Sequence, residues 1–272
     1  MLKDITIGQY FPGDSPIHKM DPRMKITLTF VYIIALFLAK NLAAVFFGIA
    51  FVVICYFISR IPLNMIIKSL KPVIPIVIFT SVLNMFFVEA GTPVFEWSFI
   101  KITTGGITIS ILMSVRIICL IAGTSLLTYT TSPIALTDGI ERLLSPLKKL
   151  KVPVHELAMM MTIALRFIPT LIEETEKIMS AQKARGADME TGGLIQRAKA
   201  LIPILIPLFV SSFRRADELA LAMECRCYHG GEGRTRMKVL KYSAVDFVAV
   251  VIILLFTGGI IYLNTIMPSI FS

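Results

Sequence analysis

The sequence predicts an all-α, polytopic membrane protein with about five transmembrane helices and a charged region of long amphipathic helices. Hydrophobic residues make up 56% of the 272 residues, charged residues make up 17%, and the mean hydropathy is +0.78. A soluble domain is typically about 45–50% apolar and about 25% charged. The apolar residues also gather in runs close to the roughly 20 helical residues that cross a bilayer. These observations indicate an integral membrane protein.

Five apolar runs are candidates for the transmembrane helices. Their predicted ranges are 24–39, 42–59, 72–88, 106–130 and 244–263. The polar stretch before the first run is too long and too acidic for the n-region of a signal peptide. We therefore expect the first helix to remain in the mature protein.

The positive charges gather on alternate sides of these runs. Lys and Arg precede the first run, separate the second from the third, and number 17 among residues 131–243, where 12 Asp and Glu accompany them. The other loops hold few basic residues. By the positive-inside rule, we expect the N-terminus and residues 131–243 in the cytoplasm of a cell membrane, and the C-terminus outside.

This pattern divides the chain into three regions. We expect an N-terminal cytoplasmic segment and four transmembrane helices in residues 1–130, and a cytoplasmic coupling region in residues 131–243. The last transmembrane helix and a C-terminal tail occupy residues 244–272. A nucleic-acid partner is not indicated, because acidic residues share the basic region and no aromatic residues interleave the basic ones.

The first transmembrane helix has a clear start signal. Asp21 is a favourable N-cap residue, and Pro22 suits the first helical position because its missing N–H is not needed there. Arg23 and Lys25 then fall in the first turn, where the helix dipole disfavours cations. We expect these two side chains to contact lipid head groups or a neighbouring loop instead.

Two later features depart from a simple run of transmembrane helices. Residues 62–71 place their apolar side chains on one face, which is typical of a short helix lying on the membrane. Arg116 interrupts the fourth run, where an arginine is costly unless it faces a polar cavity or a partner. Snorkelling or a buried structural pair is an equally good interpretation of Arg116.

The charged region begins with one short and one long amphipathic helix. The short helix is predicted to start at Ser132–Pro133, again a cap followed by proline, and to end at Pro146. The long helix opens at Pro153, and its apolar residues recur at steps of three and four. It should end near Arg185, because Gly186 suits the left-handed conformation that closes a helix.

A second long amphipathic helix follows. It is predicted to begin at Leu194 and to end at Tyr228–Gly231, with bends at Pro203 and Pro207. Its apolar run 201–210 is too short to cross a bilayer.

Each long helix ends in an arginine between small residues. The two motifs are Ala184–Arg185–Gly186 and Cys225–Arg226–Cys227. An arginine in the last turn can simply stabilise a helix end. Its repetition favours a second interpretation, in which small neighbours leave the planar guanidinium free to bind a carboxylate or carbonyl of another protein.

The sequence gives no reason to expect catalysis, a cofactor or a metal ion. Cys225, Cys227 and His229 do not form a zinc motif, because residues two apart point to opposite sides of a helix and no fourth ligand is near. The run Met159–Met161 is typical of adaptable packing. No Walker, paired-carboxylate or Ser/His/Asp pattern is present.

Three segments of the chain resemble the transmembrane T component of energy-coupling factor transporters. They are His18–Lys25, Ala164–Pro169 and Ala181–Gly186, and the matching motif positions are Asp21, Pro22, Arg23, Arg166 and Pro169. The resemblance implies a non-catalytic scaffold that joins two cytoplasmic ATP-binding cassette ATPases to a small membrane protein. That small protein, the S component, binds a vitamin or a transition-metal ion.

The resemblance also implies roles for particular residues. The two arginine motifs would insert into grooves of the two ATPases, and Arg226 matches its motif only at the arginine. We expect the exposed apolar stripes to hold the S component through Leu157, Met160, Met161, Leu201 and Leu205.

Two other function classes are open. The main alternative is a secondary transporter or channel with its own substrate pathway lined by Arg116, although the sequence shows no inverted repeat and few intramembrane charges. A membrane-bound enzyme is the other alternative, and the missing catalytic pattern disfavours it.

Overall fold

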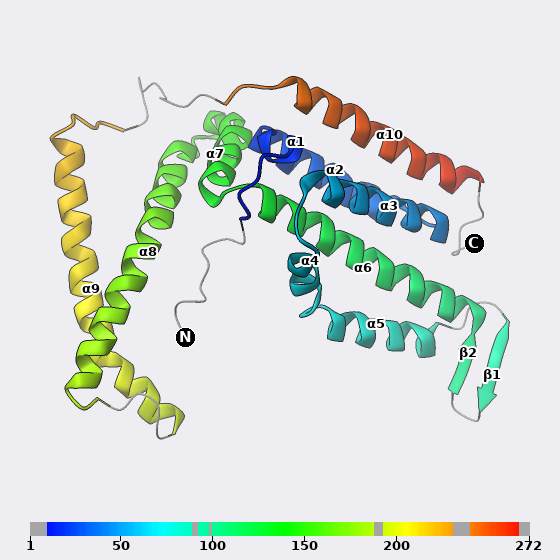
Figure 1. Cartoon of the computed structure of the whole chain (residues 1–272), viewed down its shortest axis with the longest axis horizontal. Helices are drawn as coiled ribbons and strands as arrows, with labels where there is room; N and C mark the ends of the chain where they lie inside the picture. Colours follow the sequence, from blue (N-terminus) through cyan, green and yellow to red (C-terminus); the bar gives the residue numbers. More distant parts are fainter. Residues whose placement is uncertain (1–9, 89–91, 98–99, 188–192, 231–239, 267–272) are drawn as a thin grey trace. The chain divides into compact units, whose positions relative to one another are not determined.

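The computed structural model describes residues 10–88, 92–97, 100–187, 193–230 and 240–266, and for most of residues 93–102 only the backbone (Figure 1). The chain forms two compact units. The bundle unit comprises the described part of residues 8–139 and 240–266, and the paired-helix unit comprises the described part of residues 140–239.

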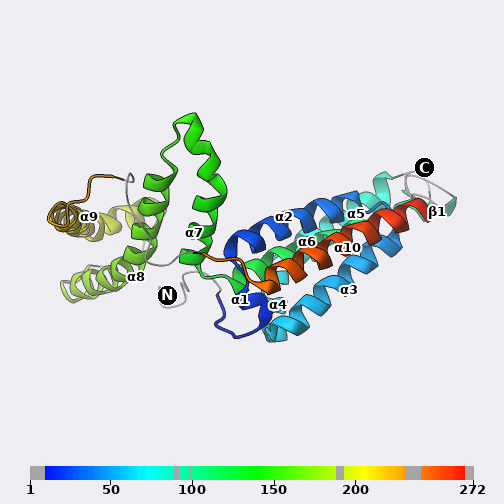
Figure 2. The same cartoon turned by 90° about the horizontal axis from the view of Figure 1, so that it is seen from above.

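The bundle unit is a group of helices around α6. Its elements are α1 (Pro16–Lys19), α2 (Pro22–Leu38), α3 (Leu42–Ser59), α4 (Leu63–Leu70), α5 (Ile74–Phe87), β1 (Pro93–Trp97), β2 (Ile100–Thr103), α6 (Thr104–Thr130) and α10 (Ala244–Ile266). The long helices α2, α3, α6 and α10 run side by side in both views (Figure 1 and Figure 2). Leu36, Val45, Leu112 and Ile260 are fully buried between them, so these helices enclose the core.

Aromatic rings fill one side of this core. The ring of Phe256 on α10 stacks on those of Phe51 and Phe47 on α3, with ring centres 4.3 and 5.5 Å apart, and on that of Tyr32 on α2 at 5.8 Å. The hydroxyls of Tyr32 and Tyr56 donate to the α6 carbonyls of Cys119 and Ala122, at 2.9 and 2.8 Å. Buried tyrosines need such acceptors, so these bonds fix α2 and α3 against α6.

The predicted helix starts are confirmed. The Asp21 carboxylate accepts from the Arg23 N–H at 2.9 Å, and Pro22 is the first residue of α2. The Ser132 hydroxyl accepts from the Ala135 N–H at 3.3 Å at the start of α7 (Pro133–Leu144). The predicted short helix near residues 62–71 is α4, which meets α5 at a bend of 55°.

A two-stranded antiparallel hairpin, β1 and β2, joins α5 to α6, and the sequence does not predict it. The remaining regular structure in the described part of the chain is helical, as predicted. The hairpin runs from Pro93 to Thr103, and the Thr103 hydroxyl accepts from the Gly106 N–H at 3.1 Å to cap α6. The strands therefore lead directly into the central helix.

Four helices of the described chain are long and apolar enough to cross a membrane: α3, α6, α8 (Val154–Ala184) and α10. The bent pair α4–α5 adds a fifth candidate. The predicted runs correspond to α2, α3, α5, α6 and α10, but α2 has only 17 residues. Helix α8 is therefore long and apolar enough to cross a membrane, although its sequence predicts an amphipathic helix outside the membrane.

The paired-helix unit is built on α8 and α9 (Leu194–Glu224), two antiparallel helices of 31 residues each. Before them come the C-terminal part of α7 and the 3₁₀ helix η2 (Ser145–Leu150). His155 at the start of α8 contacts the Glu141 carboxylate of α7 at 3.0 Å, which ties these elements together.

One polar contact between α8 and α9 depends on a proline. Pro207 has no N–H, so the Pro203 carbonyl one turn earlier has no partner within α9. The Gln182 side chain of α8 donates to that carbonyl at 3.2 Å. Close by, Ile204 of α9 is buried, with 4% of its surface exposed. The expected prolines in α9 therefore help to define where the helices meet.

Candidate functional site: two capped helix ends

The end of α8 is closed by a Schellman motif. The Ala187 N–H donates to the Gln182 carbonyl, and the Gly186 N–H donates to the Lys183 carbonyl, both at 3.0 Å. Gly186 is left-handed, with φ +82°. These two hydrogen bonds place Arg185 at the C-cap position, as the sequence predicts.

The end of α9 has the same geometry without a glycine. The Tyr228 N–H donates to the Met223 carbonyl at 3.0 Å, and the Cys227 N–H donates to the Glu224 carbonyl at 2.8 Å. Cys227 takes the left-handed position, with φ +55°. Arg226 therefore occupies the same place in its cap as Arg185 does in the first. No glycine in the sequence signals this cap, and left-handed residues other than glycine are uncommon.

Both arginine side chains are available to a partner. Arg185 and Arg226 are exposed, as are their neighbours Ala184 and Cys225, and neither guanidinium has a hydrogen bond or ion pair to another described residue. Each guanidinium presents a planar set of donors that fits a carboxylate or backbone carbonyl. The two ends are therefore equivalent cationic tips.

The two tips lie at opposite ends of a crossed pair of helices (Figure 1). At the crossing, the Arg215 guanidinium of α9 bonds the Glu174 carboxylate of α8 at 2.9 Å, and the Ser211 hydroxyl donates to the same carboxylate. The Arg215 guanidinium also lies over the Phe167 ring, 5.9 Å from its centre. Because this ion pair is only partly exposed, it is screened less than a surface pair and helps to hold the crossing.

The predicted apolar stripe is exposed on both helices. Leu157, Met160 and Met161 of α8 and Leu201 and Leu205 of α9 each expose about half of their surface. Further large apolar side chains of α9 are exposed as well: Ile195, Ile202, Ile206, Phe209, Val210 and Phe213. The α8 group and the α9 group are separate, because Pro203 of α9 contacts Gln182 near the C-terminal end of α8. Each group of exposed apolar side chains is typical of contact with another protein or with a membrane. Arg166 and Pro169 of the family motif are exposed on α8.

The N-terminal motif forms a buried network in the bundle unit. The Asp246 carboxylate of α10, 1% exposed, accepts from the Asp21 N–H at 3.0 Å and the Ser243 N–H at 2.7 Å. Arg23 bonds the Asp21 carboxylate at 2.8 Å and the Leu240 carbonyl at 3.2 Å. Burial opposes ionisation of Asp21, but hydrogen bonds from Arg23 and nearby positive charges outweigh it, so its pKa lies below the usual value. The motif therefore joins the start of α2 to the start of α10.

For the cations of the first turn, the sequence leaves contacts with lipid head groups or with a neighbouring loop open. The Arg23 bond agrees with the second of these, whereas Lys25 bonds the ends of two helices. Besides the Arg23 bond to Leu240, the Lys25 ammonium donates to the carbonyls of Thr130 at 2.8 Å and His18 at 3.1 Å. Asp246 was missed. Its only signal is that a single acidic residue opens an otherwise apolar run.

Arg116 is buried in the bundle unit and bonds a backbone carbonyl. Its side chain is 9% exposed, and its Nη2 donates to the Ala39 carbonyl at the C-terminal end of α2. A cation there also complements the negative end of the helix dipole. This contact supports the interpretation of Arg116 as a buried structural partner rather than a residue lining a pathway.

The described residues include no group of three His, Cys, Asp or Glu side chains placed to hold a metal ion. Cys225 and Cys227 are exposed free cysteines on the second tip. The site therefore offers contact surfaces, two cationic tips and an apolar stripe.

Comparisons with known proteins identify the family. Residues 13–238 match the model of the CbiQ family, described as cobalt transport protein. The chain is 58% identical to the energy-coupling factor transporter transmembrane protein EcfT of Clostridium kluyveri, over 92% of this chain and 93% of that protein. It is 46% identical to the protein of the same name from Bacillus subtilis, over 97% of this chain and 100% of that protein. The chain therefore belongs to the CbiQ/EcfT family, the non-catalytic transmembrane T components of energy-coupling factor transporters.

Proposed function

We propose that each arginine tip docks one cytoplasmic ATP-binding cassette ATPase, and that the chain couples these two ATPases to a membrane-embedded S component for uptake of a vitamin or metal ion. The observation that supports this most is the equivalence of the two caps. Arg185 and Arg226 hold the same C-cap position although their neighbouring residues differ. Helix stability alone requires neither an exposed arginine nor its repetition.

The docking chemistry follows from the guanidinium. Its parallel N–H groups bind a carboxylate or a pair of carbonyls on an ATPase surface, and a charge-assisted bond of this kind contributes about 1.5–3 kcal/mol. Closure of the ATPase pair on ATP would then displace the two tips. The crossing at Glu174 and Arg215 would pass that displacement to the apolar stripe.

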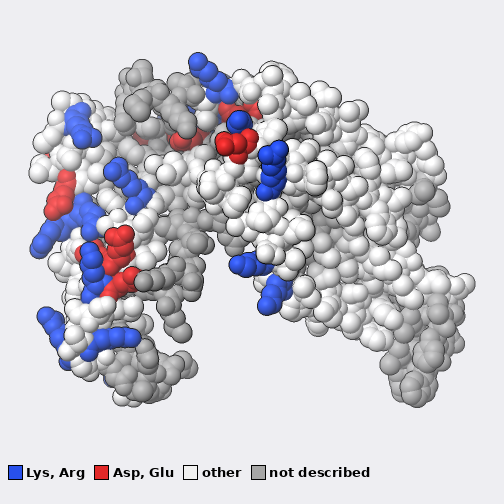
Figure 3. All heavy atoms as spheres, viewed as in Figure 1, with Lys and Arg blue, Asp and Glu red and all other residues white. Residues whose placement is uncertain are grey.

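We propose that the paired-helix unit lies on the cytoplasmic face, with the N-terminus on the same side. The basic loops support this orientation by the positive-inside rule. Figure 3 shows Lys, Arg, Asp and Glu over α8 and α9, whereas the surface over the C-terminal half of α10 is uncharged in that view. Although α8 meets the length criterion for a membrane-spanning helix, it pairs through Glu174 with a charged residue of α9, which suits a helix at the membrane surface.

The two parts of the apolar stripe, at the start of α8 and on α9, are the proposed contacts for the S component. Leu157, Met160, Met161, Leu201 and Leu205 are exposed in the chain by itself. Methionine adapts to surfaces of different shape, so this stripe suits packing against S components that share little sequence.

The test measures ATPase binding by tagged chains that carry charge reversals. We expect Arg185→Glu or Arg226→Glu to weaken binding of an ATPase subunit by tenfold or more, because each removes one charge-assisted contact and places a like charge against its acceptor. The double variant should lose both subunits. Lysine at either position should restore binding poorly, because it keeps the charge and loses the planar donor set.

Arg214→Glu is the matched control. Arg214 is an exposed arginine of α9 that lies away from the tip. Normal ATPase binding by the double tip variant, or an equal loss in the Arg214 control, would mean that the arginines only cap their helices.

A further inference from the structure

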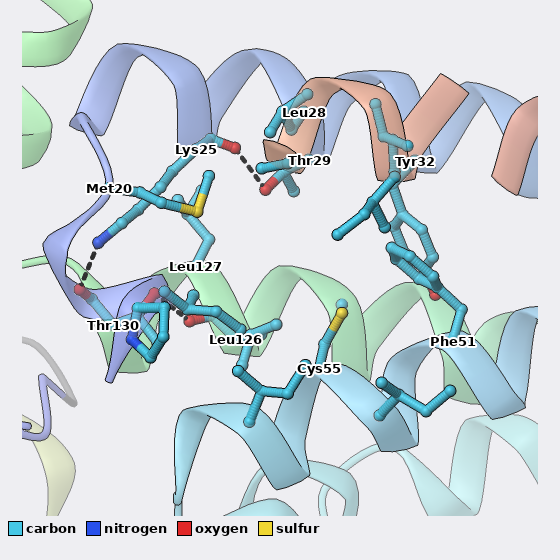
Figure 4. A pocket seen from close by; sticks show the side chains of 18 of the residues that line it. Met20, Lys25, Leu28, Thr29, Tyr32, Phe51, Cys55, Leu126, Leu127 and Thr130 are labelled. Atoms are coloured by element: carbon cyan, nitrogen blue, oxygen red, sulfur yellow. Dashed lines mark hydrogen bonds between the residues drawn. The ribbon is translucent and has the colours of Figure 1, made fainter. Parts of the chain in front are cut away.

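The bundle unit contains a cavity that the coupling function does not use. It has a volume of about 480 Å³ and lies between α1, α2, α3, α6 and α10. Figure 4 shows Tyr32 and Phe51 at one end, Cys55 and Leu126 along the wall, and Lys25 and Thr130 near the other end. Small-molecule sites in proteins occupy about 300–1,000 Å³, so the cavity is large enough for a ligand.

The cavity wall has almost no free polar group. The Thr29 hydroxyl donates to the Lys25 carbonyl at 2.7 Å, the Thr130 hydroxyl donates to the Leu126 carbonyl at 2.8 Å, and the Tyr32 hydroxyl is bonded to Cys119. Two of the three Lys25 ammonium donors are used by carbonyls. A buried water needs about two to four partners, so water has little reason to fill this space. The occupant must be mainly hydrocarbon.

The cavity opens between α3 and α10. Its lining includes Ile54 and Ile58 of α3 and Val248 and Ile252 of α10, and all four side chains are exposed on the outside of the bundle. Both helices qualify as membrane-spanning. In a bilayer crossed by these two helices, the exposed lining residues would face hydrocarbon, and the molecules able to enter would be those dissolved in it.

The cations near the cavity lie at one end. Lys25 lines it near the start of α2, and Arg60 ends α3 just after Ile58. Helix α1 packs against α3, and exposed Lys19 is its last residue. The described acidic groups nearby are exposed Asp14 and the bonded carboxylates Asp21 and Asp246. Exposed positive charge therefore exceeds exposed negative charge here, which favours an anionic head group.

We propose that this cavity binds one acyl chain of an anionic membrane phospholipid, which enters between α3 and α10 with its head group beside Lys19 and Arg60. The acyl chain of the lipid fills the cavity, whose lining side chains would otherwise lack packing partners on that side. This site is separate from the arginine tips, so it stands whether or not the tips dock ATPases.

The test uses the full chain in nanodiscs of phosphatidylcholine that contain a phosphatidylglycerol with a photoactivatable group in its acyl chain. We expect cross-links on peptides that hold Cys55 or Val248. Ala249→Phe should reduce them at least fivefold, because Ala249 lines the cavity and a ring there occupies the lipid's space. Cys55→Trp fills the cavity from the opposite wall and repeats the test if the first variant does not fold.

Val251→Phe is the matched control. Val251 lies on the same helix, is exposed, and does not line the cavity, so this variant should cross-link like the unchanged chain. Equal cross-linking by Ala249→Phe, Cys55→Trp and Val251→Phe would mean that the lipid only coats the outside of the bundle. Equal labelling by an otherwise identical phosphatidylcholine probe would overturn the anionic preference.

Discussion

Gly186→Ala tests whether the cap of α8 holds Arg185 in place. A Cβ at Gly186 would meet no atom within 4 Å, so the substitution introduces no clash. Its cost comes from φ +82°, a conformation that disfavours a residue with a Cβ by about 1–2 kcal/mol. The lower entropy of the unfolded alanine chain offsets about 0.4–1 kcal/mol. The net loss is about 1 kcal/mol, or roughly fivefold in the equilibrium for opening the cap.

Hydrogen exchange at the helix end measures this loss. The amides of Gly186 and Ala187 donate the two bonds of the cap, so their exchange should become about fivefold faster, and ATPase binding should weaken in parallel. Gly193→Ala is the matched control, because Gly193 has φ −71° and also has open space around its Cβ position. Unchanged exchange in the first variant, or an equal change in the control, would refute the role given to the left-handed glycine.

Two further predictions concern the other tip and the buried network. Cys227→Gly removes the strain of a left-handed cysteine at φ +55°. The Tyr228 amide should therefore exchange its hydrogen more slowly, and ATPase binding should be kept. Faster exchange would contradict the equivalence of the two caps. Asp246→Asn places an NH₂ group against the Asp21 or Ser243 N–H and should lower stability by about 1–3 kcal/mol, seen as a lower Tm in detergent. Asp217→Asn, at an exposed residue of α9, should leave Tm unchanged, and equal shifts would show that the Asp246 network is not special.

Features set by neighbouring residues could be predicted from the sequence. The caps at Asp21, Ser132 and Gly186 were found because each needs one residue type beside a helix start or end. The Cys227 cap was missed because nothing in a cysteine signals a left-handed conformation. The end of α9 takes that shape from its backbone bonds, not from a favourable residue.

Features that depend on distant parts of the chain were also missed. Asp246 accepts a hydrogen bond from the N–H of Asp21, which lies 225 residues earlier in the chain. The Gln182 contact requires α9 to bring the Pro203 carbonyl beside α8. The hairpin between α5 and α6 is short: apolar and polar residues alternate over only the four positions of β2, and β1 does not alternate.

The Glu174–Arg215 ion pair lies the same number of residues from each arginine tip. Eleven residues separate Glu174 from Arg185, and eleven separate Arg215 from Arg226, which is about 16 Å of helix in each case. Both arms are free of proline, since Pro169, Pro203 and Pro207 lie on the other side of the crossing. The two arms differ in their contacts, because Gln182, three residues before Arg185, donates to the Pro203 carbonyl of α9. A displacement of Arg185 would therefore act on α9 close to the tip as well as at the crossing.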